Sequence, residues 1–213
     1  MKAYKFKGPA QIPHALDIIF NHRIYCADWA TLNDPMEGVF FSSGKQNNAA
    51  VMSEIQRELR TFKVCSLAES YDSHLLWSHY ASGFSGLAIE VELPDSAPGI
   101  RKVTYDRGVF AAVQVDGPVD TRKAAEDILF SKHHVWNYEG EIRVLHTDAY
   151  FGVTVSGVIV GNRMEPALFD AMHLICRTQG IPFYRVGIGD EGLDMDAVSP
   201  LFAHAVQSSK KSK

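Results

Sequence analysis

The segment WNYEGEIRVL, residues 136–145, decides the predicted fold because charged and apolar side chains alternate along it. Successive side chains of a β-strand point to opposite faces of a sheet. One predicted face is aromatic and aliphatic and consists of Trp136, Tyr138, Ile142 and Val144. The other is polar and charged and consists of Asn137, Glu139, Glu141 and Arg143. This pattern predicts a strand of a largely antiparallel sheet that packs its apolar face on the core.

The charged face of this strand has three interpretations. It can be a solvated surface, as on many half-buried antiparallel strands. It can form a ladder of ion pairs with a neighbouring strand. It can also belong to an active site, where Glu139 and Glu141 supply carboxylates and Arg143 binds an anionic group. The rest of the chain has to decide between these three.

The length and composition of the chain predict one globular domain. Its 213 residues are 46% hydrophobic and 22% charged, which is ordinary for a folded protein. Because chains usually divide into domains only beyond roughly 250 residues, we predict a single domain over 1–206 and a disordered polar tail over 207–213. The formal net charge of −4 argues against a dominant nucleic-acid surface without excluding a local one.

The cysteines and the N-terminal segment favour a cytoplasmic protein. Cys26, Cys65 and Cys176 are odd in number and widely spaced, which is not typical of a disulfide framework. The start MKAYKFKGPAQ lacks the apolar run of a signal peptide, and no run of about 18 apolar residues follows. We therefore expect no membrane partner.

Periodicity predicts helices and strands that interleave irregularly. Amphipathic spacing indicates helices at 12–23, 47–62, 73–82, 120–134 and 165–180. Alternation and turn residues indicate strands at 3–6, 62–70, 86–94, 101–106, 155–161 and 182–186. Asp120 is expected to cap one helix and Gly180 to end another. Since the order lacks a regular βαβ repeat, we predict an α+β fold with a mixed, mostly antiparallel sheet and flanking helices.

The candidate site residues are polar or aromatic and lie near predicted strand ends. They are Tyr4, Lys5, Asn33, Asp34, Glu37, Ser66, Trp77, His79, Tyr80, Glu139, Glu141 and Arg143. Large aromatic residues such as Trp77 more often belong to the core, and Asn-Asp-Pro favours a turn in which Asn33 binds its own backbone. No zinc-type spacing of Cys and His occurs, and we expect no metal.

Five segments carry a resemblance to a known family. They are AYKF (3–6), LNDPMEG (32–38), VCSLAES (64–70), LLWSHYASGFSGLAIEVE (75–92) and KHHVWNYEGEIRVL (132–145). With them the chain resembles the uncharacterised bacterial and phage family Domain of Unknown Function 2971. Leu76 stands before Trp77 where methionine is more usual in that family. The family implies no established activity.

The order of three motifs is similar to that of the toxin-type ADP-ribosyltransferases. Those enzymes carry a basic residue on an early strand, a Ser-Thr-Ser strand, and a later strand with Glu-x-Glu. Lys5, Ser66 and the sequence Glu139-Gly140-Glu141 follow in the same order here. Lys5 replaces the usual arginine, and Leu67-Ala68 replaces Thr-Ser. The resemblance implies that NAD is bound as a substrate.

The resemblance also implies roles for these residues. Cleaving the nicotinamide–ribose bond develops positive charge on the sugar, which a fixed carboxylate stabilises. Glu141 would be that carboxylate, Glu139 would orient or deprotonate an acceptor, and Ser66 would hold the glutamate or the ribose. Lys5 and Arg143 would pair with the pyrophosphate. The other candidates for binding the nucleotide are Tyr4, Asn33, Asp34, Trp77, His79 and Tyr80.

Three function classes follow from these residues. The first is an NAD-dependent ADP-ribosyltransferase or NAD glycohydrolase with an unknown macromolecular acceptor and a role in toxicity or phage defence. The second is a non-catalytic module that binds a ligand or a protein. The third is a metal-assisted hydrolase that uses carboxylates to hold Mg²⁺ or Mn²⁺. Its carboxylates would be those of Asp34, Glu37, Glu139 and Glu141.

Overall fold

The computed structural model of the protein describes residues 1–43, 49–95, 97–106, 111–114, 118–188 and 192–197. These residues form an α+β fold in which helices flank mixed, mostly antiparallel sheet, as the sequence predicts. The chain divides into two compact units, each assembled from separate segments. The tail predicted at 207–213 lies outside the described residues.

The first unit contains Met1–His22, Ser70–Leu93 and Val153–Lys213 and is built on one sheet. The strands of this sheet, in spatial order, are β15 (Leu193–Ala197), β14 (Phe183–Ile188), β13 (Thr154–Val160), β6 (Leu87–Glu92) and β1 (Lys2–Lys7). The β13–β14 pair is parallel and the other pairs are antiparallel. A parallel pair needs a crossover, which helix α5 supplies.

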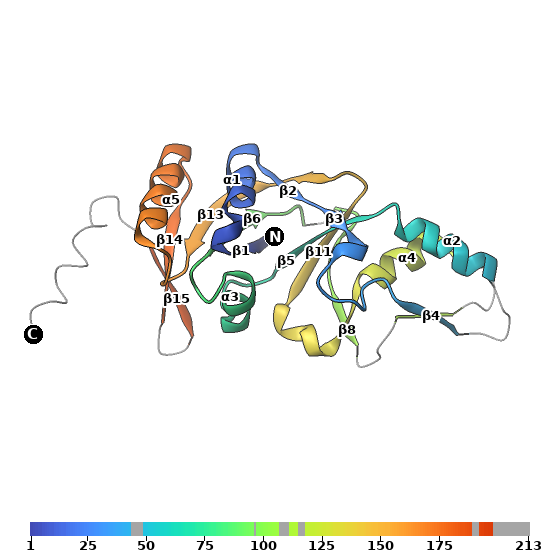
Figure 1. Ribbon diagram of the computed structural model, residues 1–213. Helices are drawn as coiled ribbons and strands as arrows, with labels where there is room; N and C mark the ends of the chain where they lie inside the picture. The colour runs from blue at the N-terminus through green and yellow to red at the C-terminus, as the bar shows by residue number, and fades with distance from the viewer. Residues whose placement is uncertain (44–48, 96, 107–110, 115–117, 189–191, 198–213) are drawn as a thin grey trace, which may run out of the picture. The chain divides into compact units, whose positions relative to one another are not determined.

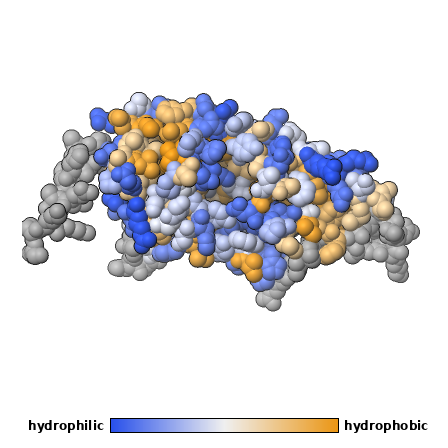
Figure 2. Space-filling model, viewed as in Figure 1, coloured by the Kyte–Doolittle hydropathy of each residue, from blue (hydrophilic) through white to orange (hydrophobic). Residues whose placement is uncertain are grey.

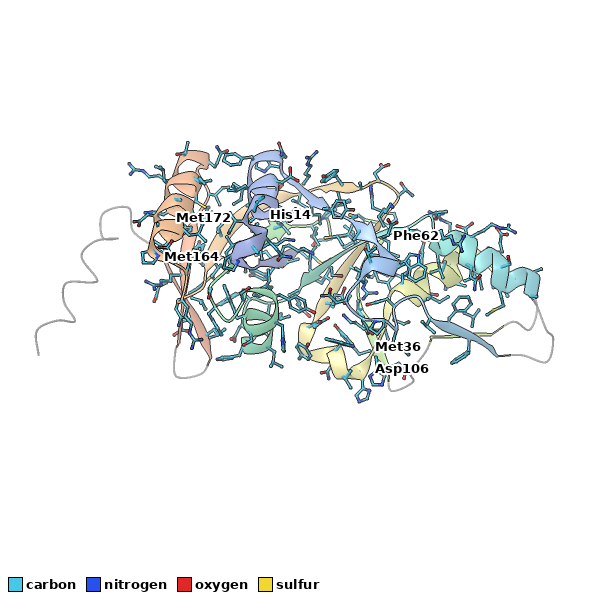
Figure 3. All side chains as sticks on the ribbon, viewed as in Figure 1. His14, Met36, Phe62, Asp106, Met164 and Met172 are labelled. Atoms are coloured by element: carbon cyan, nitrogen blue, oxygen red, sulfur yellow. The ribbon has the colours of Figure 1, made fainter. Side chains whose placement is uncertain are left out.

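The helices of the first unit lie beside this sheet. They are α1 (Ile12–Asn21), α3 (His74–Tyr80) and α5 (Pro166–Gln179), with the 3₁₀ helix η1 (Pro9–Gln11) before α1. Figure 1 shows α1 next to β1 and α5 next to β14. Helix α5 ends at Gln179, and the φ of 68° at the next residue, Gly180, confirms the predicted stop. Met172 on α5 and Met164 before it, both labelled in Figure 3, are buried.

The second unit contains Arg23–Glu69 and Pro94–Gly152. The antiparallel sheet of this unit consists, in order, of β7 (Ile100–Lys102), β11 (Glu141–His146), β5 (Lys63–Ala68) and β3 (Ala27–Asp28). Three further pairs accompany it: β8 (Thr104–Asp106) with β10 (Ser131–His133), β2 (Arg23–Tyr25) with β12 (Tyr150–Gly152), and β4 (Phe40–Ser43) with β9 (Ala111–Gln114).

Two amphipathic helices cover part of the hydrophobic core of the second unit. Helices α2 (Ala49–Leu59) and α4 (Thr121–Leu129) contribute their buried apolar residues to one cluster, together with Phe62 just after α2 (Figure 3). The 3₁₀ helices η2 (Trp29–Thr31) and η3 (His134–Glu139) complete the unit. Asp120 caps α4 as predicted, because its carboxylate accepts the Lys123 N–H at 3.0 Å.

Segment 136–145 differs from the predicted strand. Residues 134–139 form η3, and Gly140 follows in the left-handed region with φ 48° and ψ 49°. The Gly140 N–H donates to the Asn137 carbonyl at 3.2 Å, which closes a 3₁₀ turn and not a strand ladder. Strand β11 begins only at Glu141. The aromatic residues of the segment therefore do not share a strand with Glu141.

The segment 101–106 also differs from its prediction, because it contains parts of two strands, β7 and β8, and not one strand. Val103 separates them, and its N–H donates to the Glu141 carbonyl at 2.9 Å.

On the face drawn in Figure 2, hydrophobic residues gather over α1 and α5, which carry the exposed Phe20 and Leu174. Within the described ranges, no helix has both the length and the apolar character needed to cross a membrane.

Candidate functional site

The charged side chains of β11 are buried inside the second unit. Arg143 is 0% exposed and Glu141 is 3% exposed. Glu139, just before the strand, and Glu37, from the turn LNDPMEG, are 6% and 7% exposed. The interpretation of this face as a solvated surface is therefore wrong. We call Glu37, Lys132, Glu139, Glu141 and Arg143 the ionic cluster.

Arg143 is the centre of the ionic cluster because all five of its N–H donors are used. Its Nε donates to Glu141 Oε1 at 2.7 Å and its Nη2 to Glu141 Oε2 at 3.0 Å. Its Nη1 donates to Glu37 Oε2 at 2.8 Å and to the Leu129 carbonyl, and its Nη2 also donates to Glu37 Oε1. This double bidentate arrangement satisfies the guanidinium without water.

The turn LNDPMEG brings Glu37 to Arg143. Asp34, which is buried, accepts the Met36 N–H at 2.9 Å through its side chain and the Glu37 N–H at 3.1 Å through its carbonyl. Asp34 thus closes the turn that the sequence predicts, whereas Asn33 is exposed. Gly38 has φ 70°, and a Cβ there would lie 2.4 Å from the Trp29 ring. The close approach of the ring and the positive φ together favour glycine at position 38.

Lys132 completes the ionic cluster from a different pair of strands. It lies on β10, and its Nζ is 2.5 Å from Glu139 Oε2 and 3.1 Å from Glu141 Oε2. Glu37 Oε1 lies 3.9 Å from the same ammonium group. Three carboxylates therefore face two cations, so the ionised cluster carries one net negative charge. The ion-pair interpretation is confirmed, although the partners come from a turn and from β10 and not from a neighbouring strand of the sheet.

The environment of the ionic cluster lowers the pKa of one of its carboxylates and raises that of another. Burial alone would raise the pKa of Glu141, but the charge and hydrogen bonds of Arg143, with Lys132 and the Ser66 hydroxyl, lower it to about 2. For Glu37, burial outweighs Arg143 and raises the pKa. Burial would lower the pKa of Lys132, yet Glu141 and Glu139 raise it. Glu141 is therefore an ionised carboxylate at neutral pH.

Ser66 and Tyr105 hold Glu141 from two sides. Ser66 on β5 pairs in register with Arg143 on β11, and its hydroxyl donates to the Glu141 carboxylate. The Glu141 N–H donates to the Tyr105 hydroxyl oxygen at 2.8 Å. Burial raises the pKa of Tyr105 to about 12, so its hydroxyl stays neutral. The predicted residues Ser66, Glu139, Glu141 and Arg143 are thus brought together in one unit.

The other predicted nucleotide-binding residues, apart from Asn33 and Asp34, belong to the first unit. Trp77 is fully buried, with its ring edge-on to Phe6 at 5.2 Å and stacked on Phe84 at 5.5 Å between ring centroids. This packing confirms the interpretation of Trp77 as a core residue. Lys5 and Tyr80 are half-buried, and His79 is exposed.

Tyr4 belongs to a second buried polar group, which we call the Glu90 group. Glu90 on β6 is 6% exposed. It accepts from the Tyr4 hydroxyl at 2.9 Å and from the Ser156 hydroxyl at 2.8 Å, and Lys2 lies 2.9 Å away. Burial would raise the pKa of Glu90, but Lys2, Ser156 and Tyr4 lower it. Glu90 therefore also stays ionised.

Sequence reasoning missed Lys132, Tyr105 and Glu90 as members of these groups. Lys132 and Tyr105 lie on short strands of three residues, where alternation gives little signal.

Of the side chains in the described part of the chain, no three His, Cys, Asp or Glu are arranged to hold a metal ion. Comparison with known proteins finds no matching family model, no matching curated protein and no matching solved structure.

Proposed function

We propose that the second unit carries an NAD-cleaving site and acts as an NAD glycohydrolase or, with a macromolecular acceptor, as an ADP-ribosyltransferase. The observation that supports this most directly is the register of β5 and β11, which pairs Ser66 with Arg143 and brings the Ser66 hydroxyl to where it lowers the pKa of Glu141. The resemblance to toxin-type ADP-ribosyltransferases assigns these two residues to one site. Adjacent strands, β5 and β11, carry them here.

Glu141 has the charge that this reaction requires. Cleavage develops positive charge at C1 of the ribose, and an ionised carboxylate in a buried site stabilises such charge more strongly than one in water. With a pKa of about 2, Glu141 keeps its negative charge at every physiological pH. Ser66 and Arg143 fix the direction of the carboxylate, which avoids reorganisation during the reaction.

In the proposed reaction the bond between the nicotinamide nitrogen and C1 of the ribose breaks, and its electron pair leaves with neutral nicotinamide. Water or an acceptor nucleophile then bonds to C1 and gives up a proton, which Glu139 accepts. The products are nicotinamide and either ADP-ribose or an ADP-ribosylated acceptor. Glu139 is assigned this second role because its carboxylate lies close to that of Glu141, with the Lys132 ammonium 2.5 Å from one and 3.1 Å from the other.

Arg143 takes a positioning role in this proposal and does not bind the pyrophosphate. It is 0% exposed, and its five N–H groups are already bonded to Glu37, Glu141 and the Leu129 carbonyl. The proposal uses residues of the second unit only. Nucleotide-binding roles for the first-unit candidates stay predictions from the sequence resemblance.

The test is nicotinamide release from NAD by the purified protein, with and without cell lysate. We expect wild-type protein to release nicotinamide and the Glu141→Gln variant to release none. Glu90→Gln is the matched control, because it also neutralises a buried, hydrogen-bonded glutamate but lies in the first unit. Loss of release in both variants would point to a general loss of folding. Equal release by wild type and Glu141→Gln would contradict the proposal.

A second candidate function, a non-catalytic binding module, is favoured by the burial of Glu141. Only 3% of this residue is exposed, and both carboxylate oxygens already accept bonds from cations. In this candidate the ionic cluster stabilises a surface that binds a ligand or protein without turnover. No nicotinamide release, together with no heat of NAD binding in calorimetry, would select it.

The metal-assisted hydrolase receives no comparable support, because its carboxylates of Glu37, Glu139 and Glu141 face Arg143 and Lys132.

The setting that we propose is the cytoplasm of a bacterium. Cys26, Cys65 and Cys176 are buried and form no disulfide, which suits a reducing compartment. A role in toxicity or phage defence, with a macromolecular acceptor, belongs to the same proposal. Release of nicotinamide that increases when lysate is added would identify a transferase, and release independent of lysate a glycohydrolase.

A further inference from the structure

Lys132 is the cation of the ionic cluster that the proposed reaction does not use. Its side chain is 9% exposed, and its ammonium lies between Glu139 and Glu141. Both carboxylates are needed in the proposed mechanism, one beside the ribose and the other beside the acceptor. The same ammonium therefore compensates part of the negative charge of both carboxylates.

The charge of Lys132 opposes the charge that develops in the reaction. Two unit charges a few ångströms apart interact strongly when water is excluded. The positive charge that appears on the ribose would meet Glu141 already paired with Arg143 and with Lys132. Withdrawing Lys132 would change the cluster from one net negative charge to two. The potential at Glu141 would then favour a cationic transition state more strongly.

The two cations of the cluster differ in how firmly they are held. Arg143 lies on the same strand as Glu141 and uses all five donors within the unit. Lys132 lies on β10, a strand of three residues that pairs with β8. Its Nζ also lies 5.1 Å from the centroid of the Trp136 ring, a weak cation–π contact. Of the two cations, Lys132 is therefore held by fewer hydrogen bonds, two against the five of Arg143.

The β8–β10 pair acts on Glu141 as one element. Lys132 and Tyr105 are partners in its register. The Tyr105 hydroxyl accepts the Glu141 N–H at 2.8 Å, and the Lys132 ammonium contacts the Glu141 carboxylate at 3.1 Å. One two-stranded pair thus holds both the backbone and the side chain of Glu141. A shift of this pair would release both contacts together.

We propose that Lys132 is a built-in restraint of the NAD-cleaving site, which neutralises Glu141 in the resting protein and has to move away before the site is fully active. This inference rests on the proposed function. It predicts that the resting protein is a slow enzyme and that ligands or partners which displace the β8–β10 pair activate it. Lys132 is therefore a regulatory residue and not a catalytic one.

The test compares nicotinamide release by wild type, Lys132→Gln and Lys132→Arg. Glutamine keeps a donor to Glu139 and removes the charge, and we expect initial rates to rise about tenfold or more, which is about 1.4 kcal/mol of barrier. Arginine keeps the charge and should remain as slow as wild type. Lys102→Gln is the matched control, since Lys102 pairs with Glu69 in the same unit but its side chain is 63% exposed. Its rate should not change.

The outcomes separate this inference from the proposed function. If wild type releases nicotinamide and the folded Lys132→Gln variant is no faster, the inference is overturned and the function stands. If wild type releases nicotinamide slowly and Lys132→Gln releases it at least tenfold faster, both are supported. If neither wild type nor Lys132→Gln releases nicotinamide although circular dichroism shows that both are folded, the proposed function fails and the inference fails with it. Lys132→Met, which replaces the chain by an apolar one of similar length, serves if Lys132→Gln does not fold.

Discussion

The two units each bury a charged glutamate, but they compensate that charge differently. In the second unit, Glu141 is paired with Arg143 and Lys132, whose side chains are 0% and 9% exposed. In the first unit, Glu90 is held by the hydroxyls of Tyr4 and Ser156 and by Lys2, whose side chain is 60% exposed. The first arrangement confines both charges to the interior, and the second leaves the cation in water.

This difference predicts how much stability each group loses when one of its residues is replaced. A buried ion pair costs desolvation energy for both partners, and removing one partner leaves the other unpaired inside the protein. A carboxylate held by hydroxyls beside a solvated lysine loses only one hydrogen bond when one donor is removed. The ionic cluster should therefore be far more sensitive to single substitutions than the Glu90 group.

The largest effect is expected for Arg143→Met. The substitution keeps an unbranched, mainly apolar side chain but leaves Glu37 and Glu141 without their guanidinium, so we expect a loss of about 3–5 kcal/mol in the free energy of unfolding. Urea denaturation followed by circular dichroism measures it. Arg57→Met is the control, because Arg57 forms an exposed pair with Glu54 and should change little. Similar losses in both variants would remove the contrast between buried and surface pairs.

The next effect is the pH dependence of stability. The pKa of Glu141 in the folded protein is about 2, below its ordinary value of 4.5, so its contribution is present above pH 4.5 and disappears as the pH falls towards 2. The shift corresponds to about 3 kcal/mol. Glu37 has a raised pKa, so its contribution is instead present at low pH and disappears as the pH rises through that pKa.

The measurement for this second prediction is a series of urea unfolding curves from pH 7 to pH 2.5 for wild type and Glu141→Gln. We expect wild type to lose more stability than the variant between pH 5 and pH 2.5. The two proteins should therefore approach each other in stability at the acidic end. Parallel curves over this range would mean that Glu141 does not carry the depressed pKa.

A smaller effect is expected for Tyr4→Phe in the first unit. The change removes only the hydroxyl that donates to Glu90 at 2.9 Å, and Ser156 and Lys2 remain. A hydrogen bond to a charged group contributes about 2 kcal/mol, so the loss should stay below that of Arg143→Met. Thermal unfolding measures it, with Tyr25→Phe as the control because Tyr25 is 56% exposed. A loss as large as that of Arg143→Met would erase the difference between the two groups.

Local signals in the sequence were sufficient for the helices and the fold class. Asp120 and Gly180 mark helix ends through interactions within a few residues, and the amphipathic face of α2 needs only its own spacing. These features do not depend on the rest of the protein. The α+β class then follows from the order of the elements.

The ionic cluster could not be predicted as fully, because its members meet through tertiary structure. Glu37 and Arg143 are 106 residues apart, and nothing local to either residue identifies the other. Glu90 and Glu92 have the same place in the alternation of β6, yet Glu90 is buried and Glu92 is exposed. Both glutamates pair with β1 and β13, but Glu90 lies inside β6, opposite Tyr4, whereas Glu92 is the last residue of the strand. The position along the strand and the side chains opposite it therefore decide which charge is buried.

Gly140 has a consequence for how the chain tolerates mutation. Its φ of 48° and ψ of 49° place it in the left-handed region, while a Cβ there would have only an ordinary contact, 3.7 Å from the Glu69 Cβ. Space therefore imposes little restriction, and backbone conformation imposes most of it. In a saturation library at position 140 sorted by thermal stability, asparagine and aspartate should rank after glycine, and valine and isoleucine should rank last. The motif Glu-Gly-Glu would then be one case of a wider pattern, Glu-[Gly/Asn/Asp]-Glu.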